Sequence, residues 1–297
     1  MFEKIIAKKT INRLMTKPDI NKAYALTDPS DSWYPTLKKV HDSLVEIREN
    51  KHETITITSA EGYTLCAVYY PAAVDAPKGT AVFIHGYTSH AEREWAFPGL
   101  FYLNLGYNVV IPYQRAHGKS GGKYITFGAA ECDDMERWVS LIAKMHPDLP
   151  IVIHGLSMGG GIALQLCDKS LPNVKCIISD APSDSIKGLF RAIAHSEKPE
   201  KEEKQYRYLT EIFFKKTGKD VSVTEVLPHI EHSLYPLYLT AGSEENIGER
   251  LSSYAEKCPN TAEVIILPGC NHGNGMYKQT ELYHRTLREF LEKHTLK

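Results

Sequence analysis

The sequence has almost no net charge. Its 297 residues carry 35 Lys and Arg against 36 Asp and Glu, which gives a formal net charge of −1. Nucleic-acid-binding proteins normally show a basic excess or stripe, and polybasic membrane anchors need clustered cations. The composition favours neither class, and we expect no nucleic-acid partner.

Long uninterrupted apolar runs are also missing. Residues 95–114 and 149–167 contain no Asp, Glu, Lys or Arg over about the length of a bilayer span. Prolines and glycines interrupt both stretches, which is typical of strand and helix ends in a buried α/β core. The first nine residues contain too many charges for a signal peptide. We predict no membrane span and no export signal.

Paired cysteines and metal-binding motifs are absent. The six cysteines are scattered without a CxxC pair, which in a chain of this size indicates free thiols in a reducing compartment. The cytoplasm is therefore the expected location. Among the thirteen histidines, the group His85, His90 and His117 lacks HExxH or Cys/His spacing. We expect neither a metal nor an organic cofactor.

The order of apolar segments predicts an α/β fold. A hairpin over residues 54–70 precedes an alternation of strands and helices that extends to residue 293. The predicted strands are 81–84, 108–111, 151–153, 175–178, 236–239 and 263–267, and the predicted helices are 98–105, 135–145, 162–167 and 277–293. Continuous apolar strands separated by helices imply a mostly parallel twisted sheet with helices on both faces. The chemistry of such a sheet lies at the carboxyl ends of its strands.

Two segments lie outside this alternation. Residues 1–50 are predicted to be an N-terminal helical extension to the main domain over 51–297, with a helix near 37–47 packed on the body. Residues 183–233 are too long for an ordinary connection, so we predict a helical lid over the carboxyl edge of the sheet. Apolar lid residues that could face inward are Phe190, Ile193, Leu209, Ile212, Phe213 and Phe214.

The most informative motif is a G-x-S-x-G sequence, Gly155-Leu-Ser157-Met158-Gly159, which follows one predicted strand and precedes a helix. The glycines permit a turn that lifts the serine hydroxyl to the edge of the sheet. The backbone N–H of Met158 then points to the place where an oxyanion would form. This context indicates a nucleophilic Ser157 rather than a purely structural glycine-rich turn.

Residues 53–293 resemble the α/β-hydrolase superfamily. More narrowly, they resemble lidded bacterial serine hydrolases related to cinnamoyl esterases, monoglyceride lipases and prolyl aminopeptidases. His85-Gly86-Tyr87 is similar to the family's oxyanion loop, and this resemblance implies that the amide of Tyr87 is the second oxyanion donor. The loop after the fourth strand departs from the family pattern, because Tyr113 replaces an aspartate and Ala116 replaces a glycine.

The resemblance also implies the general base and its acid partner. A serine needs a base to take its proton, and His272 occupies the superfamily's position between the last strand and the last helix. His85 and His154 suit packing roles. The family's acid lies three residues after a glycine, which selects Glu245 after Gly242. Two other carboxylates remain alternatives, Glu244 and Asp180.

Together these features predict a serine hydrolase that cleaves carboxylic esters of small to medium acyl or aromatic groups through an acyl-enzyme. Four aromatic residues are expected to complete the acyl pocket, namely Tyr87, Trp95, Tyr113 and Phe127. One alternative is an aminopeptidase that acts on short peptides. A second is a catalytically silent binding protein on the same fold. The expected partner is therefore a small ester or peptide, and the sequence leaves the oligomeric state open.

Overall fold

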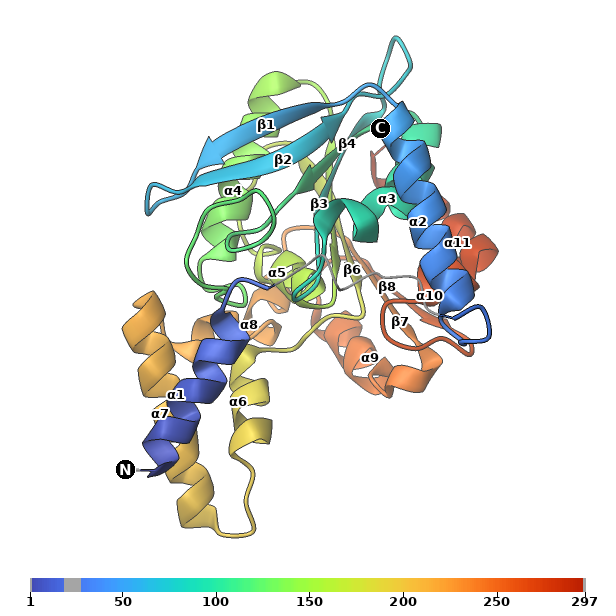
Figure 1. Cartoon of the computed structure of the whole chain (residues 1–297). Coiled ribbons are helices and arrows are strands. Elements are labelled where there is room, and N and C mark those ends of the chain that lie inside the picture. Colours follow the sequence, from blue (N-terminus) through green and yellow to red (C-terminus); the bar gives the residue numbers. More distant parts are fainter. Residues whose placement is uncertain (1, 19–27, 296–297) are drawn as a thin grey trace.

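An eight-stranded sheet forms the centre of the computed structural model, which describes residues 2–18 and 28–295 (Figure 1). The strand order is β1-β2-β4-β3-β5-β6-β7-β8. The strands are β1 (Glu53–Thr58), β2 (Thr64–Tyr70), β3 (Gly79–Ile84), β4 (Tyr107–Pro112), β5 (Ile151–Leu156), β6 (Val174–Asp180), β7 (Leu237–Gly242) and β8 (Ala262–Leu267). β1 and β2 form the predicted hairpin, β2 runs antiparallel to β4, and every later pairing is parallel. The predicted mostly parallel sheet is confirmed.

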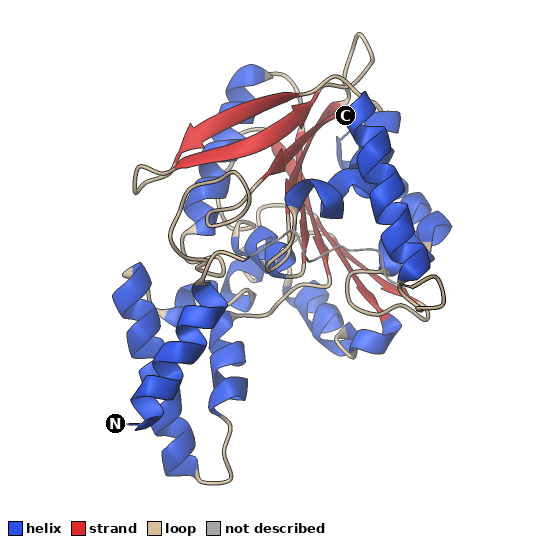
Figure 2. Ribbon diagram, in the orientation of Figure 1, coloured by secondary structure: helices blue, strands red, loops and turns tan. Residues whose placement is uncertain are grey.

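Helices cover both faces of the sheet, as Figure 2 shows. Successive residues of a strand point to opposite faces, so Val82 joins one buried cluster and its neighbour Phe83 joins the other. On the face of Val82 lie α4 (Glu131–Met145), α5 (Met158–Gln165), α8 (Leu227–Ile230) and α9 (Gly248–Lys257). On the face of Phe83 lie α2 (Tyr34–Glu49), α3 (Ala91–Asn104), α10 (Gly275–Lys278) and α11 (Thr280–Thr295).

Helix α3 begins seven residues earlier than the sequence predicts, since it continues through Pro98. The His90 side chain accepts the Arg93 N–H at the start of the helix. A proline leaves the carbonyl four residues before it without its helical donor. The hydroxyl of Tyr277 donates to that carbonyl, on Glu94, at 3.1 Å, so the helix tolerates Pro98.

Two predicted pocket residues belong to the core instead. Trp95 lies on α3 with no exposed surface and stacks on Phe83 at 4.5 Å between ring centroids. Tyr113 is also buried, and its hydroxyl donates to Glu92 at 2.5 Å. The expectation that both rings line the acyl pocket is therefore wrong. Their apolar surface is used in packing α3 against the sheet.

The predicted extension, residues 1–50, contributes two helices that pack in different places; residues 1 and 19–27 lie outside the described part. Helix α2 packs on α3, as predicted, and Arg48 forms two hydrogen bonds to Glu92 at 3.2 and 3.1 Å. Helix α1 (Phe2–Met15) instead packs against α6 (Ile186–Ala194) and α7 (Pro199–Thr217). These three helices form an arm that projects from the body, at the lower left of Figure 1.

The segment 183–233 is helical, but its apolar residues cover α1 and one another. Phe190, Leu209 and Phe213 have no exposed surface and share one cluster with Ala7 and Ile11 of α1. Ile193 and Ile212 pack against the same cluster, whereas Phe214 is 57% exposed. In place of the expected inward-facing roof, these residues form a cluster within the arm that also contacts the loop 123–130. Among the described residues, no helix is long and apolar enough to cross a membrane.

The neighbouring residues Phe213 and Phe214 allow a matched test of this packing. Phe213→Ala removes a fully buried ring, and we expect the free energy of unfolding to fall by about 3–5 kcal/mol. Phe214→Ala changes an exposed ring and should alter it by no more than about 0.5 kcal/mol. Urea denaturation of both variants measures the difference. Equal effects would contradict the burial of Phe213 in the arm.

Candidate active site

Ser157 occupies a sharply constrained turn between β5 and α5. Its backbone has φ 57° and ψ −116°, a conformation that non-glycine residues rarely adopt. A Cβ on Gly155 would lie 2.0 Å from the carbonyl oxygen of Gly159, and a Cβ on Gly159 would lie 1.9 Å from that of Ile84. Neither approach is possible for a side chain. The two glycines of the motif are therefore required for the turn that presents Ser157.

A chain of hydrogen bonds connects Ser157 to His272 and Glu245. His272 Nε2 lies 2.9 Å from Ser157 Oγ, and His272 Nδ1 lies 2.5 Å from Glu245 Oε2. The other oxygen of Glu245 accepts the N–H of Gly242 at 2.8 Å, which orients the carboxylate. The Glu245 side chain is only 7% exposed, whereas that of His272 is 58% exposed. The structure thus brings together the three residues predicted from the sequence.

The two alternative acids have other contacts. The exposed Glu244 carboxylate accepts the hydroxyl of Ser243 at 3.2 Å. Asp180 is buried at the end of β6, where its carboxylate accepts the hydroxyl of Tyr283 at 3.3 Å. Burial, followed by the negative charge of Glu245, raises the pKa of Asp180 to about 7.

The hydrogen bond to Glu245 raises the pKa of His272 above its ordinary value. Burial opposes this change, and the charge of Glu245 adds to it. The positively charged imidazolium is therefore stabilised by its carboxylate partner. This is the electrostatic behaviour that a general base needs when it takes a proton from a hydroxyl.

The predicted oxyanion donors lie on the two segments that flank Ser157. The N–H of Met158 is in the first turn of α5, where a helix provides no internal acceptor. On the other side, a Cβ on Gly86 would lie 3.4 Å from Ser157 Cβ, so the loop that carries Tyr87 passes close to the serine. The buried Glu94 accepts the Gly86 N–H at 2.7 Å and fixes this loop.

Tyr87 lines the cavity that contains Ser157, and its hydroxyl contacts the arm. Its hydroxyl donates to the carbonyl of Leu14 on α1 at 2.8 Å, and its ring stacks on Phe127 at 5.4 Å between centroids. The histidines excluded as bases have packing roles, as expected. His154 lies between Tyr102 and Tyr283, and burial lowers its pKa to about 3.

Two cavities open beside Ser157, with volumes of about 490 and 470 Å³. The first is bordered by the oxyanion loop and, on its outer side, by the extension. Extension residues on this wall are Asp31, Trp33, Thr36, Leu37 and Val40. The second lies toward Ser183, Glu244 and Arg250. The sequence did not predict that the extension lines this cavity. The spacing of Leu37 and Val40 indicates a packed helix but does not show that the helix lies next to Ser157.

The described residues contain no group of three or more His, Cys, Asp or Glu side chains that could hold a metal ion. A serine on a tight strand–helix turn, together with a histidine and a carboxylate after later strands, defines the α/β-hydrolase class. The fold fits this class, with the serine after β5, the acid after β7 and the histidine after β8.

Comparison with known proteins agrees with this classification. The family described as "Serine aminopeptidase, S33" matches residues 75–206. The uncharacterized protein YqkD of Bacillus subtilis (strain 168) is 29% identical over 276 residues, which span 85% of this chain and 83% of that protein. A monoacylglycerol lipase of Mycolicibacterium smegmatis is 38% identical over 88 residues, 29% of this chain and 31% of the lipase.

Solved structures share the fold. The Pyrococcus furiosus esterase PF2001 superposes with a TM-score of 0.67 at 22% identity, covering 95% of this chain and 98% of that chain. Est1E from Butyrivibrio proteoclasticus, with ferulic acid bound, gives a TM-score of 0.64 at 18% identity over 82% of this chain and 100% of its own. The chain therefore has the α/β-hydrolase fold and is similar to hydrolases of this fold.

The contact between His272 and Glu245 can be tested by titration. We expect NMR to give His272 a pKa above 6.5, and Glu245→Gln to lower it, because the main cause of the shift is removed. Because the folded protein holds the proton on His272 more tightly than the unfolded chain does, protonated His272 stabilises the fold below about pH 6.5. This contribution is lost as the pH rises through the pKa of the folded state. An unchanged pKa in Glu245→Gln would contradict the pairing.

Proposed function

We propose that this protein hydrolyses carboxylic esters of small to medium acyl or aromatic groups, with Ser157, His272 and Glu245 as a catalytic triad. The observation that carries the proposal is the unbroken path of hydrogen bonds from Ser157 Oγ through His272 to Glu245. The bond lengths of 2.9 and 2.5 Å suit proton transfer from the hydroxyl to the imidazole.

In the first half of the reaction, His272 Nε2 takes the hydroxyl proton as Ser157 Oγ attacks the ester carbonyl. The amides of Tyr87 and Met158 stabilise the negative oxygen of the tetrahedral intermediate. His272 then gives its proton to the departing alcohol, which leaves an acyl group on Ser157. Glu245 keeps the imidazole in the required tautomer and stabilises its charged form throughout.

In the second half, a water molecule replaces the alcohol. His272 accepts a proton from this water as its oxygen attacks the acyl-enzyme, and the same two amides stabilise the new oxyanion. Collapse of the intermediate returns the proton to Ser157 and releases the carboxylic acid. These steps need only side-chain and backbone groups of the chain.

The lining of the two cavities supports a division between the acyl and alcohol groups. The cavity of about 490 Å³ includes Trp33, Leu37 and Val40, and this apolar wall suits an uncharged acyl chain or aromatic ring. The cavity of about 470 Å³ includes Asp184 and Arg250, whose polar groups suit an alcohol. Together they support substrates of modest size.

One observation supports a second candidate, an aminopeptidase. A free peptide amine needs a nearby carboxylate, and Asp31 lies on the wall of the cavity that contains Ser157 and His272. This acid is on the extension. A panel of p-nitrophenyl esters and aminoacyl anilides would decide which leaving group the site accepts.

Replacement of the nucleophile tests the proposal directly. Ser157→Ala should lower kcat for ester hydrolysis by about a thousandfold or more and abolish labelling by a fluorophosphonate probe, with the fold retained. Residual turnover within tenfold of the unmodified protein would exclude Ser157 as the nucleophile. A protein that never reacts with the probe would be the catalytically silent alternative.

Adjacent glutamates provide the matched control for the acid. Glu245→Gln should lower kcat by at least about a hundredfold through loss of imidazolium stabilisation. Glu244→Gln makes the same chemical change on an exposed side chain and should be nearly neutral. If Asp180→Asn lowered kcat severely and Glu245→Gln lowered it only mildly, Asp180 would be the acid of the triad in place of Glu245.

Helix α2 offers a test of the acyl wall. Leu37→Ala should make room for longer chains and raise the kcat/KM ratio of octanoate to acetate esters by about tenfold. Val45 is 65% exposed on the same helix, and Val45→Ala should leave this ratio unchanged. A shift caused instead by Phe214→Ala would make the segment 183–233 the selector.

A further inference from the structure

A third cavity, of about 820 Å³, lies where the arm meets the body. It is larger than either cavity at Ser157 and is bordered by α1, α7, the loop 123–130 and the turn between β1 and β2. Tyr63 and Tyr124 contribute aromatic surface, and Asn12 and Thr217 contribute neutral polar groups. A concave site of this size, with both aromatic and polar groups in its lining, suits a small molecule.

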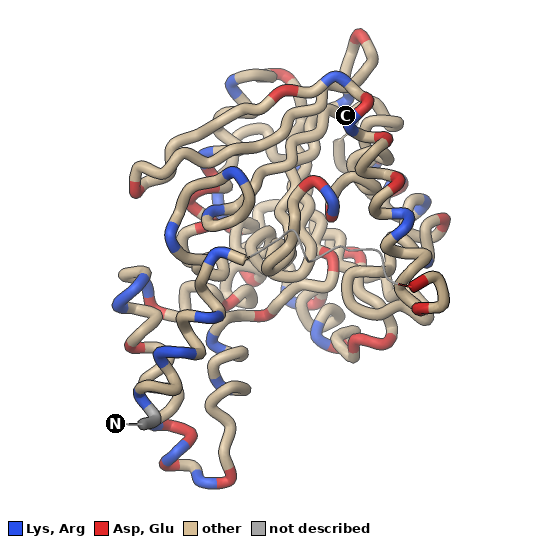
Figure 3. Tube along the Cα trace, viewed as in Figure 1, with Lys and Arg blue, Asp and Glu red and all other residues tan. Residues whose placement is uncertain are grey.

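Five lysines from three separate segments line this cavity. Lys4 and Lys8 come from α1, Lys123 from the loop, and Lys215 and Lys216 from the end of α7. Figure 3 marks basic positions along α1 and at the end of α7 that lies toward the body. In the part of the chain that the structure describes, none of the five ammonium groups forms an ion pair with a carboxylate.

Two of these lysines converge on one ring. The ammonium of Lys216 lies 3.9 Å from the centre of the Tyr124 ring, and that of Lys123 lies 5.7 Å from it. Their attraction to the phenolate, led by the hydrogen bond from Lys216, lowers the pKa of Tyr124. Both cations thus lie where they would stabilise a negative charge beside the Tyr124 ring.

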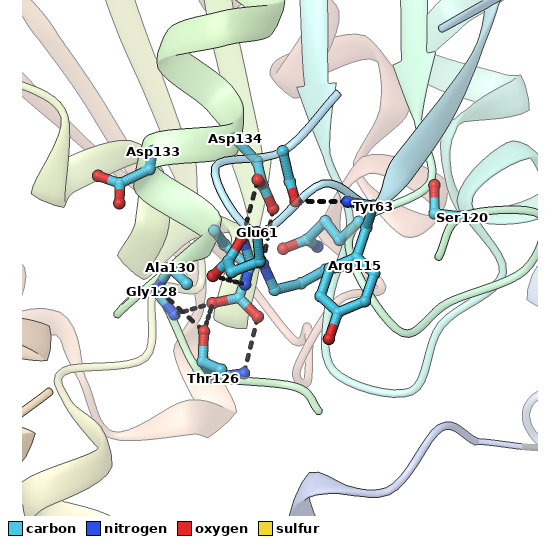
Figure 4. Close-up of polar contacts among 12 residues, drawn as sticks. Glu61, Tyr63, Arg115, Ser120, Thr126, Gly128, Ala130, Asp133 and Asp134 are labelled. Carbon is cyan, nitrogen blue, oxygen red and sulfur yellow. Dashed lines mark hydrogen bonds and ion pairs between the residues drawn. The ribbon is translucent and has the colours of Figure 1, made fainter. Parts of the chain in front are cut away.

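Glu61 in the cavity lining, and the buried Asp134 and Glu131 near it, are held by other groups (Figure 4). Arg115 donates two hydrogen bonds to Asp134, at 2.7 and 2.8 Å, and two to Glu61, at 2.9 and 3.1 Å. This pairing lowers the pKa of Glu61 to about 2. Glu131 accepts the N–H groups of Thr126 and Gly128. These acids are fixed by neighbouring donors and do not reach the lysines.

The charges therefore remain unbalanced at the mouth of the cavity. The lining contains six cationic side chains and two carboxylates, Glu61 and Glu211. When the buried Asp134 and Glu131 are added, cations still exceed carboxylates by two. Like charges held together repel one another, and an anion bound between them would relieve this cost. A chain with a net charge of −1 has no general excess of lysine that would explain the cluster.

We propose that this cavity binds a soluble organic polyphosphate, separately from the ester site. Lysine ammonium groups bind phosphate oxygens as point charges, and five of them match several phosphate groups better than a single carboxylate. The rings of Tyr63 and Tyr124 offer apolar surface to the organic part. The concave shape favours a small molecule over a bilayer, whose flat surface cannot enter between the arm and the body.

Binding of inorganic tripolyphosphate to the full-length protein tests this site by isothermal titration calorimetry. Lys123→Gln/Lys216→Gln should raise Kd at least tenfold. The control Lys51→Gln/Lys201→Gln removes the same charge from exposed positions outside the cavity and should change Kd by less than twofold. Saturating tripolyphosphate should also raise Tm, since it binds only the folded state, and the cavity variant should lose this increase.

Three results would overturn the proposal. They are the absence of tripolyphosphate binding, equal weakening in the two double variants, and binding of phosphatidylglycerol vesicles in place of tripolyphosphate through the same lysines. Activity on p-nitrophenyl acetate is measured in parallel and should stay within twofold in both double variants. Failure of the polyphosphate site is thus distinguishable from failure of the proposed esterase function.

Discussion

The crowded turn at Ser157 is the constraint on which the rest of the site depends. Gly155 and Gly159 approach neighbouring carbonyls so closely that β3, β5 and the start of α5 have one possible spacing. The backbone of Ser157 is fixed further by its N–H, which donates to the carbonyl of Asp180 at 2.9 Å. Strained backbone persists only where its surroundings hold it, and here the surroundings are the central strands of the sheet. The serine and its flanking amides are therefore oriented by the core itself.

The parts of the site that were predictable from the sequence are those with a local signal. Ser157 is marked by the glycines that flank it in the G-x-S-x-G motif. Glu245 and His272 each follow a predicted parallel strand, and the carboxyl ends of parallel strands meet at one edge of the sheet. The wrong predictions concern side chains whose environment depends on distant packing. Trp95 was expected to line the acyl pocket. It lies instead on α3, which continues through Pro98 with the help of a hydrogen bond from Tyr277, and its ring is buried. A local sequence pattern around Trp95 cannot predict this contact, because Tyr277 is distant in the sequence.

The structure of the N-terminal extension, residues 1–50, was also predictable only in part. Its helical patterns are visible in the sequence, but their partners are not: α1 joins the arm, and α2 joins the body beside Ser157. Two long-range interactions fix this division. Arg48 ties α2 to the buried Glu92, and the Tyr87 hydroxyl ties the carbonyl of Leu14 on α1 to the oxyanion loop. Both helices of the extension thus contact the candidate active site, α1 at the oxyanion loop and α2 at the wall of the cavity beside Ser157.

Asp180 also lies close enough to the imidazole of His272 to influence it, which raises the question of why Glu245 is its partner. Asp180 is buried beside Tyr283 and has a pKa of about 7, so its environment disfavours a permanent negative charge near neutral pH. The Glu245 carboxylate instead accepts a hydrogen bond from the Gly242 N–H. The turn Ser243–Glu245 places this side chain, which is longer than that of aspartate, against His272. A stable charge is what an imidazolium partner must provide. The chain therefore separates the two carboxylates by environment: Glu245 contacts the imidazole of His272, and Asp180 lies in the core beside Tyr283.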